Sequence, residues 1–150
     1  NYRHLDIEVL PGITAMLAAS ARAGAPLGHD FCAINLSDNL KPWELIEKRL
    51  RLASEADFAM AFYNPRSKSR PNGFARALDV LKACCKDDRP VIFARAVSTN
   101  DETINIVGLS QTTAEMADMR TMVIVGSSHT RLIQRTGQTP WVYTPRSVPE

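Results

Sequence analysis

The sequence predicts an α/β protein, with a mixed sheet of about five strands and flanking helices. Two segments, 57–63 (DFAMAFY) and 121–126 (TMVIVG), are apolar at nearly every position, which is typical of strands buried on both faces. Segments with apolar residues at helical spacing alternate with these and other strand-like segments. No repeat, low-complexity stretch or linker interrupts the chain, so residues 1–150 are expected to form one α/β domain.

The N-terminal third predicts a helix, a strand and a second helix. A turn is expected at Pro11-Gly12, and the Ala-rich residues 14–24 after it predict a helix that ends at a glycine. Residues 30–37 predict a short strand. Residues 41–56 predict the clearest helix, because their apolar residues recur at helical spacing and a proline stands near the start.

The rest of the chain continues the alternation of strands and helices. The predicted elements are a strand at 57–63, a helix at 72–86, strands at 90–97 and 103–109, and strands at 121–126 and 140–146. Thr112 and Glu115 have the spacing of a capping box, which predicts a short helix between the strands at 103–109 and 121–126. Prolines flank the last strand, which favours a position at the edge of the sheet.

Composition excludes several classes of protein. A net charge of +2 is too small to indicate nucleic-acid binding, and the longest apolar segments are shorter than a membrane span. Three cysteines without a CxxC spacing favour neither a disulfide framework nor a metal site. We therefore expect a cytoplasmic protein without a signal peptide, and the first twelve residues, which lack an initiator Met, suggest a segment of a longer chain.

Candidate ligand-binding positions lie where predicted strands end, as is usual in α/β proteins. Polar segments follow three strands, at 63–66, 95–99 and 126–130, and the turn at 11–14 precedes a helix whose free N–H groups could meet a polar ligand. No phosphate-binding glycine motif, GxSxG or HExxH motif is present, and the three histidines are scattered. This pattern favours a protein that positions a reactive cofactor and its substrate.

The loop YNPRSKSRP, residues 63–71, is basic and directly follows a buried strand. It carries Arg66, Lys68 and Arg70. Such a loop is most often simply solvated, but it could also bind an anionic ligand, because arginine pairs well with carboxylates. The residues alone leave both interpretations open.

Three segments resemble the tetrapyrrole methylase family of corrin biosynthesis: residues 9–50 with their PGIT and GAPLGHDF motifs, residues 56–71 with YNPRSK, and residues 121–131. The resemblance implies a two-domain, homodimeric enzyme that holds S-adenosylmethionine in the cleft between its domains. Residues 1–150 would be the C-terminal lobe, since the N-terminal glycine-rich GxGPGD stretch and the GDP loop of the family are missing.

The implied function is methyl transfer to ring carbon 17 of precorrin-3B, with ring contraction to precorrin-4. Two alternatives are methyl transfer to cobalt-factor III and a non-catalytic dimerisation or interaction domain. The catalytic residues are unknown, with His129 and Asp38 as possible acid or base groups. Ser127, His129 and Ala96 depart from the residues that the family more often carries there.

The resemblance also implies which residues bind ligands. Those expected to bind the cofactor are Thr14, Ala15, Tyr63, Asn64, Ala96, Val97, Thr121 and Met122. Ala15 would lie against the methionine end of the cofactor, although from the pattern alone it is equally a packed helix start. The basic loop residues Arg66, Lys68 and Arg70 would pair with the acetate and propionate carboxylates of the tetrapyrrole.

Overall fold

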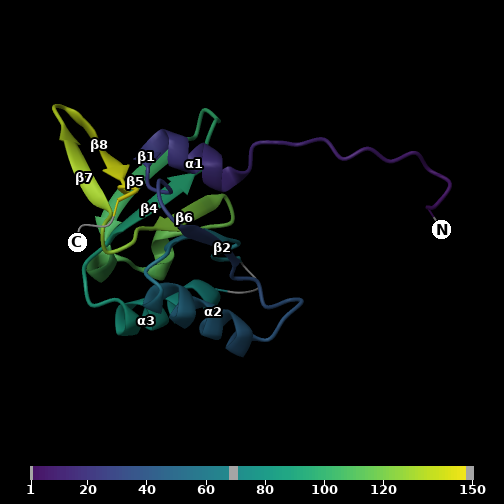
Figure 1. Cartoon of the computed structure of the whole chain (residues 1–150), viewed down its shortest axis with the longest axis horizontal. Coiled ribbons are helices and arrows are strands. Elements are labelled where there is room, and N and C mark those ends of the chain that lie inside the picture. Colours follow the sequence, from purple (N-terminus) through teal and green to yellow (C-terminus); the bar gives the residue numbers. More distant parts are fainter. Residues whose placement is uncertain (1, 68–70, 148–150) are drawn as a thin grey trace.

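A computed structural model describes residues 2–67 and 71–147 of the chain. The described part contains a five-stranded sheet, a smaller three-stranded sheet and three α-helices arranged in layers (Figure 1). Lys68 and Arg70, which the sequence pointed to as substrate-binding residues, lie outside the described residues.

The larger sheet has the strand order β2-β3-β6-β4-β5. Its strands are β2 (Phe31–Asn35), β3 (Ala59–Tyr63), β4 (Pro90–Arg95), β5 (Thr103–Gly108) and β6 (Thr121–Val125). β2 and β3 are parallel, whereas β6 is antiparallel to both of its neighbours, β3 and β4. The predicted fold class, a mixed sheet of about five strands with flanking helices, is confirmed.

One face of this sheet is covered by α2 (Trp43–Glu55) and α3 (Gly73–Cys84) (Figure 1). Both helices bury the apolar stripes that their sequences predict. Phe74 of α3 meets Phe93 of β4 edge to face, with ring centroids 6.0 Å apart. The larger of two apolar cores therefore lies between these helices and the sheet.

The other face of the sheet is covered by α1 (Ala15–Ala23) and by the small sheet, β1 (Gly24–Ala25), β8 (Gln138–Tyr143) and β7 (Arg131–Arg135), in that order. α1 buries two alanines, so its backbone lies close to the sheet. Gly24 ends the helix with φ +127°, and a Cβ there would lie 2.6 Å from the carbonyl oxygen of Val142. Only glycine therefore allows the chain to pass directly from α1 into the small sheet.

Two expectations about these elements are wrong, and two strands were not expected. β8 was expected at an edge, but it lies between β1 and β7, neither of which the sequence indicated. Pro140 is tolerated in this central strand because the β7–β8 register is irregular between Ile133 and Arg135. The capping box is not formed either: Thr112 separates two 3₁₀ turns, and its Oγ1 donates to the carbonyl of Leu109 at 2.6 Å.

The N-terminal segment also differs from its expectation. Residues 6–14 form neither helix, strand nor turn, so the turn expected at Pro11-Gly12 is absent. The segment extends away from the body of the molecule (Figure 1), and most of its apolar side chains are exposed. Among residues 2–67 and 71–147, no helix is both long and apolar enough to cross a bilayer.

A buried arginine joins the strands at one edge of the larger sheet. Arg89, 5% exposed, precedes β4 and pairs with Asp57 before β3 at 3.1 Å and with Asp87 at 2.7 Å. Asp57 also accepts hydrogen bonds from the N–H and Oγ of Ser128, which follows β6. Burial would lower the pKa of Arg89, but the hydrogen bond to Asp87 and the nearby negative charges, including those of Asp87 and Asp57, together outweigh burial. The pKa is therefore raised and the guanidinium stays charged.

Candidate functional site

A cleft of about 990 Å³ lies at the opposite edge of the larger sheet. β3 and β4 end at this edge, and β6 begins there because it runs antiparallel to both. α1 and the loop after β4 provide further parts of its wall. Seven of the eight predicted cofactor-binding residues line this cleft: Ala15, Tyr63, Asn64, Ala96, Val97, Thr121 and Met122. The sequence therefore identified positions that are distant in the chain and that the fold brings together.

Tyr63 ties the end of β3 to the start of α1. Its hydroxyl group is hydrogen-bonded to Oγ1 of Thr14, the eighth predicted residue, and accepts a hydrogen bond from the N–H of Met16 at 3.4 Å. Thr14 directly precedes α1 and makes no side-chain cap to its own helix. Ala15 is the first helical residue, and its small side chain leaves the start of the helix open to the cleft.

Left-handed backbone conformations occur at two positions of the cleft wall where strands end. Asn64 after β3 and Ala96 after β4 both have φ 51°, a region that costs energy for residues other than glycine. Ala96 is held there by hydrogen bonds, since its N–H donates to the carbonyl of Arg120 at 3.0 Å and its carbonyl accepts from Oγ1 of Thr99 at 2.8 Å. Strained residues of this kind cluster at ligand sites.

The start of β6 is fixed by Asp118. Its carboxylate accepts hydrogen bonds from Arg95 Nε at 2.7 Å, from Thr121 Oγ1 at 2.7 Å and from the N–H of Arg120 at 2.9 Å. Partial burial would raise the pKa of Asp118, but these hydrogen bonds outweigh burial and hold the pKa below its usual range. The ionised carboxylate thus positions Thr121 and Met122 in the cleft wall.

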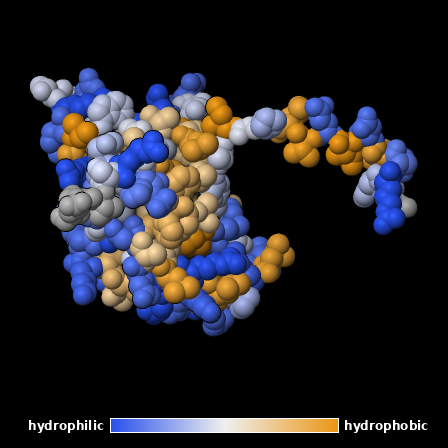
Figure 2. Space-filling model, in the orientation of Figure 1, coloured by the Kyte–Doolittle hydropathy of each residue, from blue (hydrophilic) through white to orange (hydrophobic). Residues whose placement is uncertain are grey.

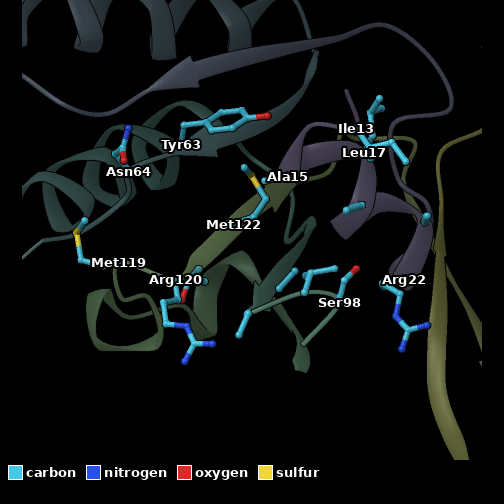
Figure 3. A pocket seen from close by; sticks show the side chains of 16 residues that line it. Ile13, Ala15, Leu17, Arg22, Tyr63, Asn64, Ser98, Met119, Arg120 and Met122 are labelled. Carbon is cyan, nitrogen blue, oxygen red and sulfur yellow. The ribbon is translucent and has the colours of Figure 1, made fainter. Parts of the chain in front are cut away.

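Two arginines of the cleft wall have no signal in the sequence that would identify them. Arg22 of α1 pairs with Glu102 at 2.6 Å, and Arg120 pairs with Asp101 at 3.2 Å. Glu102 also accepts from the N–H of Ser98, and this hydrogen bond, followed by that from Arg22, lowers the pKa of the Glu102 carboxyl. Both acids belong to the loop between β4 and β5. In Figure 3, Arg22 and Arg120 lie on one side of the cleft and Tyr63 on the other.

The wall of the cleft is mainly apolar. Figure 2 shows hydrophobic residues gathered below α1 and beside the base of the N-terminal segment. No lining residue in the described part of the chain is aspartate, glutamate, histidine, cysteine or lysine. Such a wall can hold an apolar heterocycle against backbone groups, but it offers no side chain that titrates near neutral pH. A wall of this kind can position a bound ligand.

The remaining sequence-based candidates do not line the cleft. His129 follows the end of β6 and so lies at the opposite edge, beside Ser128. Residues 126–130 lie there, away from the cleft, because β6 runs antiparallel to β3 and β4. Asp38 lines a separate cavity of about 210 Å³ with Trp43. Arg66 lines a cavity of about 570 Å³ that adjoins the cleft. No group of three potential metal ligands occurs among residues 2–67 and 71–147.

Together, the layered sheet and the cleft at one of its edges define an α/β protein with a candidate ligand site where strands end. The family model described as Tetrapyrrole (Corrin/Porphyrin) Methylases matches residues 1–113, and the chain therefore belongs to this family. The resemblance seen in the sequence motifs is confirmed.

Relatives of known name lie within this family. The chain is 53% identical over 146 residues to a precorrin-3B C(17)-methyltransferase of Sinorhizobium sp, covering 97% of the chain and 58% of the relative. It is 44% identical to a probable cobalt-factor III C(17)-methyltransferase of Salmonella typhimurium, covering 93% of the chain and 59% of the relative. The crystal structure of the methyltransferase CobJ superposes with a TM-score of 0.88 at 62% identity, covering 96% of the chain and 58% of that structure. The chain thus spans somewhat more than half the length of these relatives.

Proposed function

We propose that the chain is the C-terminal lobe of an S-adenosylmethionine-dependent methyltransferase that acts on precorrin-3B at ring carbon 17, with contraction of the ring to precorrin-4. The observation that carries this proposal is the cleft, which gathers Ala15, Tyr63, Ala96 and Met122 from four separate segments. Membership of the tetrapyrrole methylase family and the names of the relatives support it.

The residues of the cleft fit such a cofactor. The small side chains of Ala15 and Ala96 leave room beside the backbone for a flat heterocycle, and Thr121 and Met122 would border it on the β6 side. S-adenosylmethionine, when bound, supplies a methyl group already activated by its sulfonium. The protein's own task is then to align donor and acceptor and to exclude water, and an apolar wall without acidic or basic catalysts serves that task.

The side of the cleft that is open in this chain is where an N-terminal domain would close over the cofactor. We expect this domain to carry the GxGPGD and GDP motifs and the whole enzyme to be a cytoplasmic homodimer. These remain predictions about the longer protein.

A cobalt-containing substrate is the second candidate, because the relative from Salmonella typhimurium is named for cobalt-factor III. The two can be separated by incubating the full-length enzyme and S-adenosylmethionine with each substrate in turn. A mass gain of one methyl group on the metal-free precorrin alone supports the first candidate. The reverse result supports the second, and S-adenosylmethionine binding without methylation of either substrate would favour a non-catalytic role.

Replacement of Ala15 by Leu in the full-length protein tests the cofactor site. The larger side chain should crowd the start of α1 and raise the Kd for S-adenosylhomocysteine. For the wild type we expect a micromolar Kd, which corresponds to a binding free energy of about −8 kcal/mol. Ala83→Leu is the matched control, since Ala83 is exposed on α3, which covers the other face of the sheet. Calorimetry that finds no binding by the wild type refutes the proposed function. Unchanged affinity in Ala15→Leu, with a native circular dichroism spectrum, removes Ala15 from the site.

A further inference from the structure

The second cavity adjoins the cleft and shares two lining residues with it, Met119 and Arg120. This cavity, of about 570 Å³, is also lined by Arg66 and by Ala117 and Asp118, which precede β6. Methyl transfer requires the acceptor to lie directly beside the donor. If the cleft holds the methyl donor, the adjoining cavity is where part of the acceptor would lie, and Arg120 stands at the boundary between them.

The backbone of Arg120 is fixed, whereas its side chain is accessible. Its N–H donates to Asp118 Oδ1 at 2.9 Å, and its carbonyl accepts from the N–H of Ala96 at 3.0 Å. The side chain is 48% exposed and pairs with Asp101, itself 66% exposed, with 3.2 Å between the guanidinium nitrogen and Oδ2. In Figure 3 the guanidinium points away from Met122 at the centre of the cleft. An exposed pair of this kind contributes little and exchanges readily.

The neighbouring ion pairs are held more tightly. Arg22 binds Glu102 at 2.6 Å, and the exposed fraction of that carboxylate is 14%. Arg95 binds Asp118 at 2.7 Å, and Asp118 has two further hydrogen-bond donors. Breaking either pair would disturb a segment of the cleft wall. Moving Arg120 off Asp101 would leave the wall in place, so Arg120 is the cleft arginine most available to a ligand.

We propose that Arg120 binds a side-chain carboxylate of the tetrapyrrole substrate and that this carboxylate takes the place of Asp101. The proposal rests on the proposed function and adds to it a residue and a competing internal partner. A guanidinium offers two parallel donors to a carboxylate, and substrate binding exchanges one carboxylate partner for another. Arg66, across the same cavity, can bind a second carboxylate of the same periphery.

Because Asp101 would compete with the substrate carboxylate for Arg120, substitutions at the two residues should change tetrapyrrole binding in opposite directions. Arg120→Gln removes the cation and should weaken binding of a polycarboxylated tetrapyrrole roughly tenfold, whereas Asp101→Asn removes the competitor and should tighten it. Asp101→Asn should leave the affinity for S-adenosylhomocysteine unchanged, and Arg120→Gln should change that affinity less than it changes porphyrin binding. A purely structural role for the Arg120–Asp101 pair would move both variants in the same direction.

The affinity for uroporphyrin III is measured by fluorescence titration and the affinity for S-adenosylhomocysteine by calorimetry, both on the full-length protein. Arg49→Gln is the control for loss of one positive charge, because Arg49 is exposed on α2, which covers the other face of the sheet. Weaker porphyrin binding by Arg120→Gln together with tighter binding by Asp101→Asn supports the proposal. Should Arg120→Gln fail to fold, Asp101→Asn decides alone, and unchanged or weaker porphyrin binding overturns the proposal.

The two remaining outcomes separate the possible errors. If Arg120→Gln loses affinity for S-adenosylhomocysteine and keeps its affinity for the porphyrin, the carboxylate belongs to the cofactor and the proposal is wrong. If the wild type does not bind S-adenosylhomocysteine at all, the proposed function itself fails and this inference with it.

Discussion

The left-handed conformation at Ala96 predicts an unusual response to glycine. Ala96 and Ala94 are both nearly inaccessible, 8% and 1% exposed, and stand two residues apart at the end of β4. Only Ala96 has a positive φ, 51°. The same substitution, Ala to Gly, therefore removes a buried methyl group at both positions but relieves backbone strain at only one of them.

The expected difference follows from three terms. Loss of a buried methyl group costs about 0.8 kcal/mol, and the greater freedom of glycine in the unfolded chain costs roughly 0.5–1 kcal/mol, at both positions. At Ala96, glycine also removes a left-handed penalty of roughly 1–2 kcal/mol. Ala94→Gly should then lower the free energy of unfolding by about 1.5 kcal/mol, and Ala96→Gly should leave it nearly unchanged.

Urea unfolding followed by circular dichroism measures both free energies, and the midpoint of thermal unfolding gives a second reading. For a chain of this size, about 1.5 kcal/mol corresponds to a difference of roughly 3–6 °C between the two midpoints. Equal losses of stability in the two variants would refute the reasoning, because they would mean that the loop relaxes and that no strain is stored at Ala96.

Three further predictions concern charged residues. Asp118→Asn should lower the free energy of unfolding at neutral pH by about 1 kcal/mol. The pKa of Asp118 is lowered in the folded protein, so its stabilising contribution is present above the unfolded pKa of about 3.9 and is lost as the pH falls through the folded pKa. Measured against pH, the unfolding free energy of the variant should therefore fall less steeply in acid than that of the wild type. An unchanged acid limb would contradict this role for the Arg95–Asp118 pair. Arg89→Met should lower the free energy of unfolding by about 2 kcal/mol, because it leaves the carboxylate of Asp87 without its partner. If urea unfolding shows no loss, the Arg89–Asp87 pair makes no net contribution to stability. Arg66→Ala should weaken uroporphyrin III binding by up to roughly tenfold and leave the affinity for S-adenosylhomocysteine unchanged. If the variant binds uroporphyrin III as tightly as the wild type, the loop around Arg66 is simply solvated.

Much of the larger sheet and its helices could be predicted from the sequence, because each carries a strong local pattern. The apolar strand at 57–63 and the stripe along 41–56 have no competing interpretation, and both elements form within two residues of their expected ends. β7 was missed because its sequence, RLIQR, is exposed along almost its whole length. The central place of β8 was missed because the register irregularity that accommodates Pro140 depends on its partner strand.

The cofactor-binding candidates show a similar division. Positions within the segments that resemble the family, such as Ala15 and Tyr63, line the cleft. The place of His129, away from the cleft, could not be predicted, because the residues of a strand do not show in which direction it runs in the sheet. Only the pairing of β6 shows at which edge it ends. Arg22 and Arg120 lie outside the family motifs, and only the fold brings them to the same wall.

The β7–β8 hairpin offers a practical attachment point. Its turn, Thr136-Gly137, is exposed, and a Cβ at Gly137 would meet no atom within 4 Å. In Figure 1 the tip of the hairpin projects from the body on the side away from the N-terminal segment and the start of α1. A cysteine introduced at Thr136 could carry a dye or a surface tether at a distance from the cleft, and ligand exchange at Arg120 could then be followed on immobilised protein.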